Sequence, residues 1–174
     1  MSLGPGARKS TGSTDCDLIF TSCSVANATQ ATPNAQAGGQ RRQVVVGGKR
    51  VKTIDVHAHC VIAEAMALLG KSLDENERRG AGLSEVGGRR IREMDQQGID
   101  VEALSINPFW YRAERDVAAQ IVKIQNEKLA EFCANHPDRF VAFASVALQF
   151  PELAIEQLEH GVKELGLRGA AVGG

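Results

Sequence analysis

The chain has 174 residues, of which 43% are hydrophobic, and its formal net charge is −1. This length suits one domain of ordinary size, and the near-neutral charge argues against nucleic acid as a partner. No uninterrupted apolar run in the sequence is long enough to span a bilayer. The four cysteines are irregularly spaced and include no CxxC pair, which argues against both a zinc ribbon and a disulfide framework.

Residues 1–43 differ in composition from everything that follows them. They are rich in Gly, Ser, Thr, Ala, Asn and Gln and show little periodicity, so we expect a largely disordered leader. The same segment contains the parts of an export signal, namely a basic Arg8-Lys9 pair, an apolar stretch over 18–23 and A-x-A sites at 26–28 and 35–37. Two interpretations stay open: a cytoplasmic protein, or export to the periplasm through a degenerate, twin-arginine-like leader.

Residues 44–174 alternate between strand-like and helix-like patterns. Strands are expected over 44–46, 51–59, 101–106, 140–148 and 167–172, and helices over 62–69, 89–97, 116–136 and 151–165. We expect Asp116 to cap the third of these helices. Ile155, Leu158, Val162 and Leu165 recur at helical spacing and predict a core-facing stripe on the fourth. Successive strand-to-helix repeats predict a parallel sheet with right-handed crossovers.

The most informative motif is His57-Ala58-His59, at the end of the strand over 51–59. Alternation along a strand predicts that Asp55, His57 and His59 share one face, and that Ile54, Val56 and Ala58 share the other. Two imidazoles at this spacing can converge on one divalent ion, so His57 and His59 are candidate metal ligands. The alternative is a solvated edge strand that carries two surface histidines. Cys60 has the opposite parity to the histidines, which favours a packing role.

Two parallel α/β architectures are compatible with the repeats, an open dinucleotide-binding sheet and a (β/α)8 barrel. The first would carry G-x-G-x-x-G after its first strand, but residues 57–62 contain no glycine, and no P-loop is present. Histidines at the C-terminal end of the first strand favour the barrel. A closed barrel needs eight strands and about 250 residues. We therefore expect an α/β fold that corresponds to the N-terminal half, about four β/α units, of a TIM-type barrel.

Several stretches resemble a known family in order and spacing. They are T-I-D-V-H-A-H (53–59), I-R-E-M-D-Q-Q-G-I-D (91–100), A-L-S-I-N-P (103–108), N-E-K-L-A-E-F (126–132), H-P-D-R-F-V-A-F-A-S-V-A-L-Q (136–149) and P-E-L-A-I-E-Q-L-E-H-G-V-K-E-L-G-L-R-G (151–169). Residues from about 51 to 174 resemble the amidohydrolase superfamily, specifically its aminocarboxymuconate-semialdehyde decarboxylase-like branch. The resemblance covers some 120 residues.

The resemblance implies a metal-dependent enzyme that removes CO2 from unsaturated or aromatic carboxylates without an organic cofactor. It implies Zn²⁺ or Mn²⁺ as the metal, with His57 and His59 as two ligands. The other ligands and the catalytic histidine are expected beyond residue 174, so the fragment alone is expected to be inactive. Two alternatives stay open: a metal-dependent hydrolase that uses the same site, and a catalytically dead half-barrel that acts as an interaction module.

Asn107, Phe109 and Trp110 follow the strand over 101–106, where substrate-lining groups of a barrel belong. Their aromatic rings are suited either to stacking on a planar substrate or to plugging the end of the barrel, and both interpretations stay open. The expected partner is a small carboxylate substrate. We also expect the full-length protein to form a homo-oligomer.

Overall fold

The computed structural model describes residues 18–21, 41–71 and 88–173. Its elements are β1 (Leu18–Thr21), β2 (Val45–Val46), β3 (Lys49–Arg50), β4 (Ile54–Ile62), α1 (Ala63–Ala67), α3 (Gly88–Gln97), β5 (Val101–Ser105), α4 (Arg115–Asn135), β6 (Phe140–Ala142) and α5 (Pro151–Lys163). Every helix in this part of the chain is too short or too polar to cross a membrane.

A four-stranded sheet forms the centre of the fold, in the order β1-β4-β5-β6. Strands β4, β5 and β6 are parallel, which confirms the prediction of an α/β fold with a parallel sheet. Strand β1 pairs with β4 in the antiparallel sense, with Thr21 opposite His59. Residues 18–21, within the segment expected to be largely disordered, thus form a strand at the edge of the sheet. The rest of that segment up to residue 40 lies outside the described residues.

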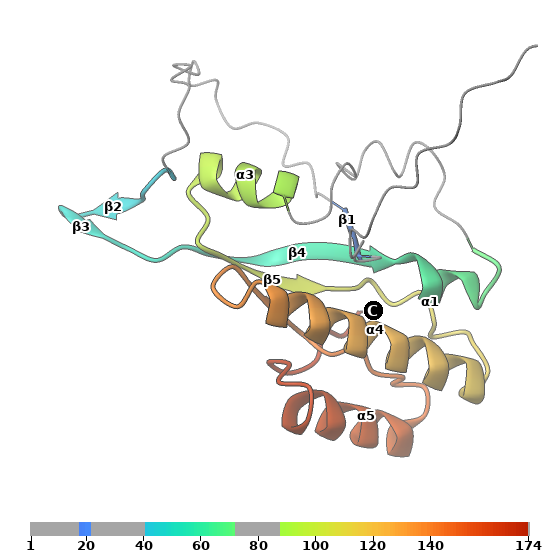
Figure 1. The fold of residues 1–174 in the computed structure, drawn as a ribbon. Coiled ribbons are helices and arrows are strands. Elements are labelled where there is room, and N and C mark those ends of the chain that lie inside the picture. The colour runs from blue at the N-terminus through green and yellow to red at the C-terminus, as the bar shows by residue number, and fades with distance from the viewer. Residues whose placement is uncertain (1–17, 22–40, 72–87, 174) are drawn as a thin grey trace, which may run out of the picture.

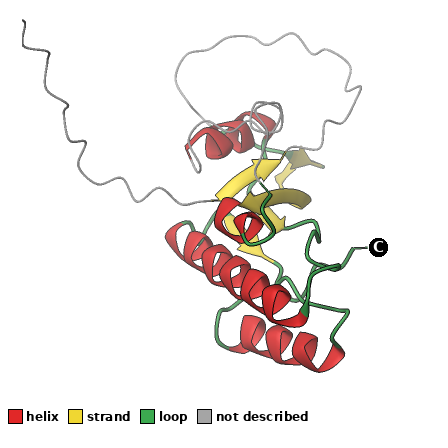
Figure 2. Cartoon of the chain, turned by 90° about the vertical axis from the view of Figure 1, so that its right-hand side faces the viewer, coloured by secondary structure: helices red, strands yellow, loops and turns green. Residues whose placement is uncertain are grey.

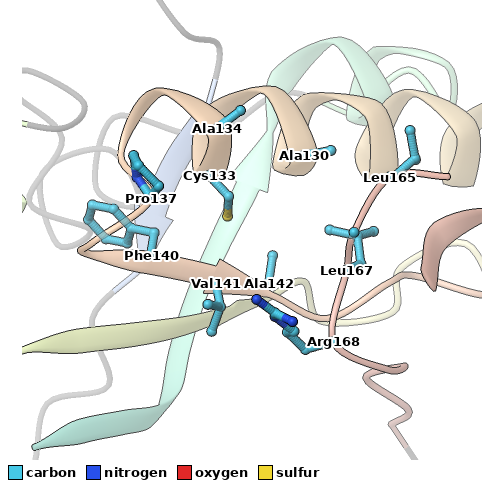
Figure 3. Close-up of a pocket in the computed structure, with 11 residues that line it drawn as sticks. Ala130, Cys133, Ala134, Pro137, Phe140, Val141, Ala142, Leu165, Leu167 and Arg168 are labelled. Atoms are coloured by element: carbon cyan, nitrogen blue, oxygen red, sulfur yellow. The ribbon is translucent and has the colours of Figure 1, made fainter. Parts of the chain in front are cut away.

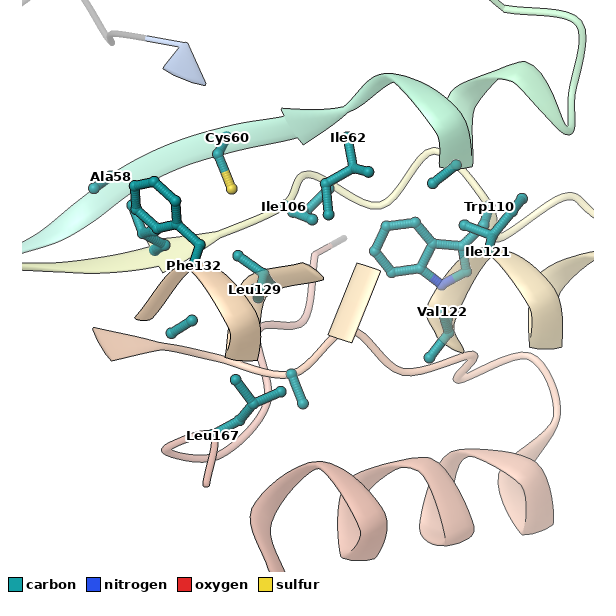
Figure 4. Close-up of a cluster of buried hydrophobic side chains, with 14 of the residues drawn as sticks. Ala58, Cys60, Ile62, Ile106, Trp110, Ile121, Val122, Leu129, Phe132 and Leu167 are labelled. Atoms are coloured by element: carbon teal, nitrogen blue, oxygen red, sulfur yellow. The ribbon is translucent and has the colours of Figure 1, made fainter. Parts of the chain in front are cut away.

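Helix α4 covers one face of the parallel strands, and α5 lies beside α4 (Figures 1 and 2). The side chains between α4 and the sheet form the main core, and Figure 4 shows several of them converging from β4, α4 and the loop after β5. The largest fully buried side chains include Trp110, Phe132, Phe140, Ile62 and Leu129. Burying an aliphatic or aromatic side chain of this kind stabilises a fold by about 1.5–3 kcal/mol.

The strands predicted over 140–148 and 167–172 are shorter than their patterns suggested. Strand β6 ends at Ala142, and the segment over 167–172 joins the sheet through a single bridge between Ala144 and Ala170. One reason is that the side chain of Asn126, on α4, hydrogen-bonds to both backbone polar groups of Ser145. Its Oδ1 accepts a hydrogen bond from Ser145 N at 2.7 Å, and its Nδ2 donates to Ser145 O at 3.0 Å. The side-chain amide satisfies groups that a longer strand would pair in the ladder.

The predicted cap of α4 is wrong. The helix begins at Arg115, its N-cap is Glu114, and no side chain makes a capping hydrogen bond there. Asp116 lies in the first turn, where its side chain is 92% exposed. A carboxylate at that position still interacts favourably with the positive end of the helix dipole. By contrast, Pro151 begins α5 at the first helical turn, as predicted.

The apolar stripe predicted to face the core on α5 faces solvent instead. Ile155, Leu158 and Val162 are 61%, 37% and 42% exposed. The buried residues of α5 are Leu153, Ala154 and Gly161, and Leu165 beyond the helix packs against the core. Small residues decide this orientation, because a Cβ at Gly161 would lie only 3.0 Å from the Cβ of Ala144. The helix therefore packs through the face that allows the closest approach.

Asp100 ties together the starts of β4 and β5. Its carboxylate accepts hydrogen bonds from Thr53 N at 2.7 Å and from Thr53 Oγ1 at 3.2 Å. It also pairs with Arg50 and, at 3.0 Å, with Arg41, while its own side chain is 6% exposed. In return, Thr53 O accepts from the backbone N–H groups of Asp100 and Val101. The hydrogen bond from Thr53 N, with the two guanidinium groups, holds the pKa of Asp100 below its usual value.

We expect Gly161→Val to lower the free energy of unfolding by about 1–3 kcal/mol, because the added methyl groups force α5 away from Ala144. Urea denaturation followed by circular dichroism measures this change. His160→Val is the matched control, since His160 is exposed on the same helix and the substitution reproduces the cost of a β-branched residue. An equal effect of the two substitutions would contradict the close packing at Gly161.

The Asp100 pKa predicts how stability depends on pH. A carboxyl group whose pKa is lower in the folded state stabilises the fold above its unfolded pKa, near 3.9, and loses that contribution as the pH falls through the folded value. Acidification from about pH 6 to about pH 3 should therefore lower the urea midpoint less in Asp100→Asn than in the wild type. Glu102→Gln is the opposite control, because burial raises the pKa of Glu102. The urea midpoint of Glu102→Gln should fall more on acidification than that of the wild type, because the wild type gains stability when Glu102 becomes protonated.

Candidate metal centre

Strand β4 has one face packed on the helices and one face that carries the histidines. Ala58, Cys60 and Ile62 are no more than 1% exposed and belong to the core. This burial confirms the packing role predicted for Cys60. His57 is exposed and His59 is half-buried, and both lie on the opposite face. The alternation along this end of the strand therefore separates hydrophobic packing from the candidate metal ligands.

The two imidazole rings lie side by side in the middle of β4, at the C-terminal end of the ladder that β4 forms with β5. Their centroids are 4.8 Å apart, and the rings meet edge to face at 86°. Both rings thus lie on the same side of the sheet, as the spacing predicted. At this separation two ring nitrogens can bind one ion at about 2.0–2.1 Å after small side-chain rotations.

A neighbouring strand contacts the second histidine. Ser105, the last residue of β5, lies opposite His59 in the parallel register. Its Oγ is 3.0 Å from His59 Nδ1, and Ser105 is 8% exposed. Only Nδ1 of His59 takes part in this contact, and Nε2 lies on the side of the ring away from Ser105.

The environment of His59 favours its neutral form. Burial lowers the pKa of His59 below its ordinary value, and repulsion from a protonated His57 lowers it further. A hydrogen bond with the Ser105 backbone acts in the opposite direction. Neutral imidazole is the form that binds metal ions. At neutral pH the site therefore presents a ring that needs no proton loss before it coordinates an ion.

A one-residue shift in register interrupts β4 between Asp55 and Ala58, a stretch that includes His57. Asp55 pairs with Glu102, whereas Ala58 pairs with Leu104, so three residues of β4 span two of β5. Asp55 Oδ1 accepts a hydrogen bond from His57 N at 2.9 Å, which satisfies the backbone inside this bulge. Glu102 and Ser105 are three positions apart on β5, so their side chains point to opposite faces of the sheet. Their partners Asp55 and His59 therefore also lie on opposite faces. The prediction that Asp55 shares the histidine face is wrong.

The bulge also explains a second departure from the predicted alternation. Ile54 and Val56 were expected on the buried face with Ala58, but they are 55% and 69% exposed. Ile54 precedes the shift in register, Val56 lies within it, and the core against α4 begins only at Ala58. Strict alternation fails here because an extra residue changes the phase of the strand.

The loop after β5 divides the three predicted substrate-lining residues. Asn107 is exposed and Phe109 is half-buried, with Lys71 Nζ 5.8 Å from the centroid of its ring. Trp110 is fully buried, and its Nε1 donates to Val146 O at 2.9 Å (Figure 4). Trp110 is therefore a core residue and not a substrate-lining group. Asn107 and Phe109 remain candidates.

A cavity of about 210 Å³ lies on the helix-covered side of the sheet, between α4, β6 and residues 165–168 (Figure 3). Its lining is mostly apolar, with the thiol of Cys133 and the guanidinium of Arg168 as the reactive or charged groups. Neither His57 nor His59 borders it. This cavity is therefore separate from the candidate metal centre.

The donor atoms fit half of a metal site. His57 and His59 supply two nitrogen donors, and a tetrahedral zinc site needs four ligands. Among residues 18–21, 41–71 and 88–173, no cluster of three or more His, Cys, Asp or Glu side chains could hold an ion. The described part of the chain thus holds two of the donors that a metal centre would need.

Comparison with known proteins identifies this arrangement. The sequence model of the amidohydrolase family matches residues 54–174, which include both histidines, the bulge and all three parallel strands. The chain belongs to the amidohydrolase family. This membership confirms the resemblance drawn from the sequence motifs.

Characterised amidohydrolases of similar sequence are decarboxylases. The chain is 42% identical over 94 residues to a gamma-resorcylate decarboxylase of Rhizobium sp. strain MTP-10005, and the match covers 53% of this chain and 29% of that enzyme. It is 31% identical over 86 residues to the 2-amino-3-carboxymuconate-6-semialdehyde decarboxylase of Dictyostelium discoideum, covering 48% and 24%. The chain thus matches less than a third of the length of these relatives.

Two solved structures that are similar to this chain are also those of decarboxylases. The dihydroxybenzoic acid decarboxylase of Polaromonas sp. JS666, with bound manganese and the inhibitor 2-nitroresorcinol, superimposes with a TM-score of 0.60 at 35% identity. A 2,6-dihydroxybenzoate decarboxylase in complex with 2,6-dihydroxybenzoate superimposes with a TM-score of 0.57 at 32% identity. Each match covers 71% of this chain and 38% of the other.

Removal of the His57 ring should raise the pKa of His59, because a protonated neighbour no longer opposes its protonation. The measurement is an NMR titration of the His59 ring in wild type and His57→Ala. His160→Ala, on the exposed face of α5, should leave the His59 titration unchanged. A His59 pKa that stays constant or falls in His57→Ala would contradict the coupling of the two rings.

Proposed function

We propose that residues 44–174 form the N-terminal half, about four β/α units, of a (β/α)8 barrel in a metal-dependent decarboxylase of aromatic carboxylates. In this proposal residues 1–43 are a leader. The observation that carries the proposal is the His57–His59 pair, two rings 4.8 Å apart at the C-terminal end of the ladder between β4 and β5. In barrels of this class that end of the strands carries the active site.

The chemistry of the pair supports a divalent cation, Zn²⁺ or Mn²⁺, without an organic cofactor. The related Polaromonas decarboxylase holds manganese. When bound, such an ion supplies positive charge that stabilises negative charge on substrate oxygens. In this chain His57 and His59 would hold the ion, and Asn107 and Phe109 would line the substrate side of the site. We place the remaining ligands and the catalytic histidine beyond residue 174.

The proposed reaction breaks the bond between a ring carbon and its carboxylate. CO2 leaves, and a proton takes its place on the ring carbon. The substrate is a small planar carboxylate of the class bound by the related 2,6-dihydroxybenzoate decarboxylase. The half-buried ring of Phe109 offers a stacking surface, and the nearby Lys71 ammonium offers a positive charge to a carboxylate. We further propose that the full-length protein is a cytoplasmic homo-oligomer.

A second candidate function is an interaction module that uses the half-barrel without catalysis. The observation that favours it is the absence of a third metal-ligating side chain beside the histidines in the described residues. The same chain, joined to the missing part of a barrel, distinguishes the two functions. Restored turnover supports the enzyme, and a complete barrel without turnover supports the module.

The experiment is a chimera in which residues 54–174 replace the matching region of the Polaromonas decarboxylase. We expect it to convert 2,6-dihydroxybenzoate in the presence of Mn²⁺, and His57→Ala should lower the rate by at least about 100-fold, since loss of a direct ligand exceeds the effect of outer-shell changes. His160→Ala serves as the control histidine and should retain full activity.

The isolated 174-residue chain is tested in parallel, so that the result does not depend on folding of the chimera. We expect weak Zn²⁺ binding that disappears in His57→Ala, and no measurable turnover, because two neutral imidazoles are half of a ligand set. Retained Zn²⁺ binding in His57→Ala would contradict the proposed site. Metal-dependent turnover by the monomeric chain would contradict the need for further ligands.

A further inference from the structure

Ser105 makes a contact with His59 that the metal-binding proposal does not by itself explain. The Oγ atom lies 3.0 Å from Nδ1, which is a hydrogen-bonding distance. Ser105 is 8% exposed, and polar side chains buried to this degree are usually hydrogen-bonded. The ring nitrogen and the hydroxyl therefore satisfy each other at the edge of the histidine face.

We propose that Ser105 is a positioning residue that accepts a hydrogen bond from Nδ1–H of His59 and so directs Nε2 toward the metal. This inference rests on the proposed function for the identity of the ligand. A ligating histidine generally donates its other ring N–H to an outer partner, which selects the tautomer and fixes the ring orientation. In neutral histidine one ring nitrogen is a donor and the other an acceptor, so a proton held on Nδ1 leaves the Nε2 lone pair for an ion.

The bulge in β4 brings His59 and Ser105 together. Ile54 pairs with Val101, and uninterrupted pairing from there would set Ala58 opposite Ser105. The extra residue between Asp55 and Ala58 moves the register by one, so that His59 lies opposite Ser105 instead. The hydrogen bond from His57 N to Asp55 Oδ1 stabilises that extra residue. The contact is thus a product of the strand pairing and not of the local sequence around His59.

The neighbouring strand holds Ser105 in place more firmly than a loop would. Ser105 ends β5, whose residues 101–105 are all buried between β4 and β6. Precise placement matters because a ligand ring that rotates freely must be ordered when the ion binds, which weakens binding. The inference concerns His59 alone, because it is the His59 ring that the Ser105 hydroxyl contacts.

The test is ¹⁵N NMR of the histidine rings in the full 174-residue chain at a pH where both rings are neutral. We expect the wild-type His59 to show a protonated Nδ1 and an unprotonated Nε2. Ser105→Ala should shift His59 toward the Nε2–H tautomer, and Ser105→Thr, which keeps the hydroxyl, should restore the wild-type pattern. The ring signals of His57 provide an internal control and should keep their tautomer in all three proteins.

Zn²⁺ titration of the same proteins provides the second measurement. We expect Ser105→Ala to weaken binding by about 10- to 100-fold, and Ser105→Thr to bind as the wild type does. An unchanged His59 tautomer in Ser105→Ala, with circular dichroism showing a folded protein, would overturn the inference. If the wild-type chain bound no Zn²⁺ at all, the proposed function would fail, while the tautomer measurement would still decide the role of Ser105.

Discussion

The Asp100 carboxylate is the constraint on which the arrangement of the sheet depends. It joins the backbone of Thr53, just before β4, to the start of β5, and two arginines neutralise its charge. Because strands are stiff and their pairing is periodic, a contact at one end sets which residues meet at the other. The pairing that begins at Ile54 and Val101 therefore ends, one bulge later, with His59 beside Ser105.

The two faces of β4 then serve different purposes. One face carries small and apolar side chains that pack on α4, and its close packing extends outward to α5 through Gly161. The other face carries two imidazoles with little hydrophobic cover. A rigid, well-packed layer behind the strand supports the precision that a metal ligand requires, since a ligand on a mobile backbone loses affinity to ordering costs.

Family membership and geometry support each other at this site. The amidohydrolase match covers the strands that hold His57 and His59, and similar decarboxylases act on or bind hydroxylated benzoates. The chain nevertheless spans 38% of a related structure, and its described residues hold no group of three or more candidate metal ligands. Catalysis by a complete barrel is thus a proposal about a larger assembly, to which this chain would contribute the parallel strands β4, β5 and β6 and the candidate ligands His57 and His59.

The sequence by itself determined the element types, the parallel α/β class, the family and the shared side of His57 and His59, because these follow from local periodicity and motif order. It misplaced Asp55, Ile54 and Val56, because a bulge is decided by pairing between strands distant in sequence. It also misjudged the outward stripe of α5, and it left two roles open for Trp110, which the structure buries. A helix or an aromatic side chain can satisfy its hydrophobic pattern in more than one orientation. Tertiary contacts select one of them, namely the close packing at Gly161 and the hydrogen bond from Trp110 to Val146 O.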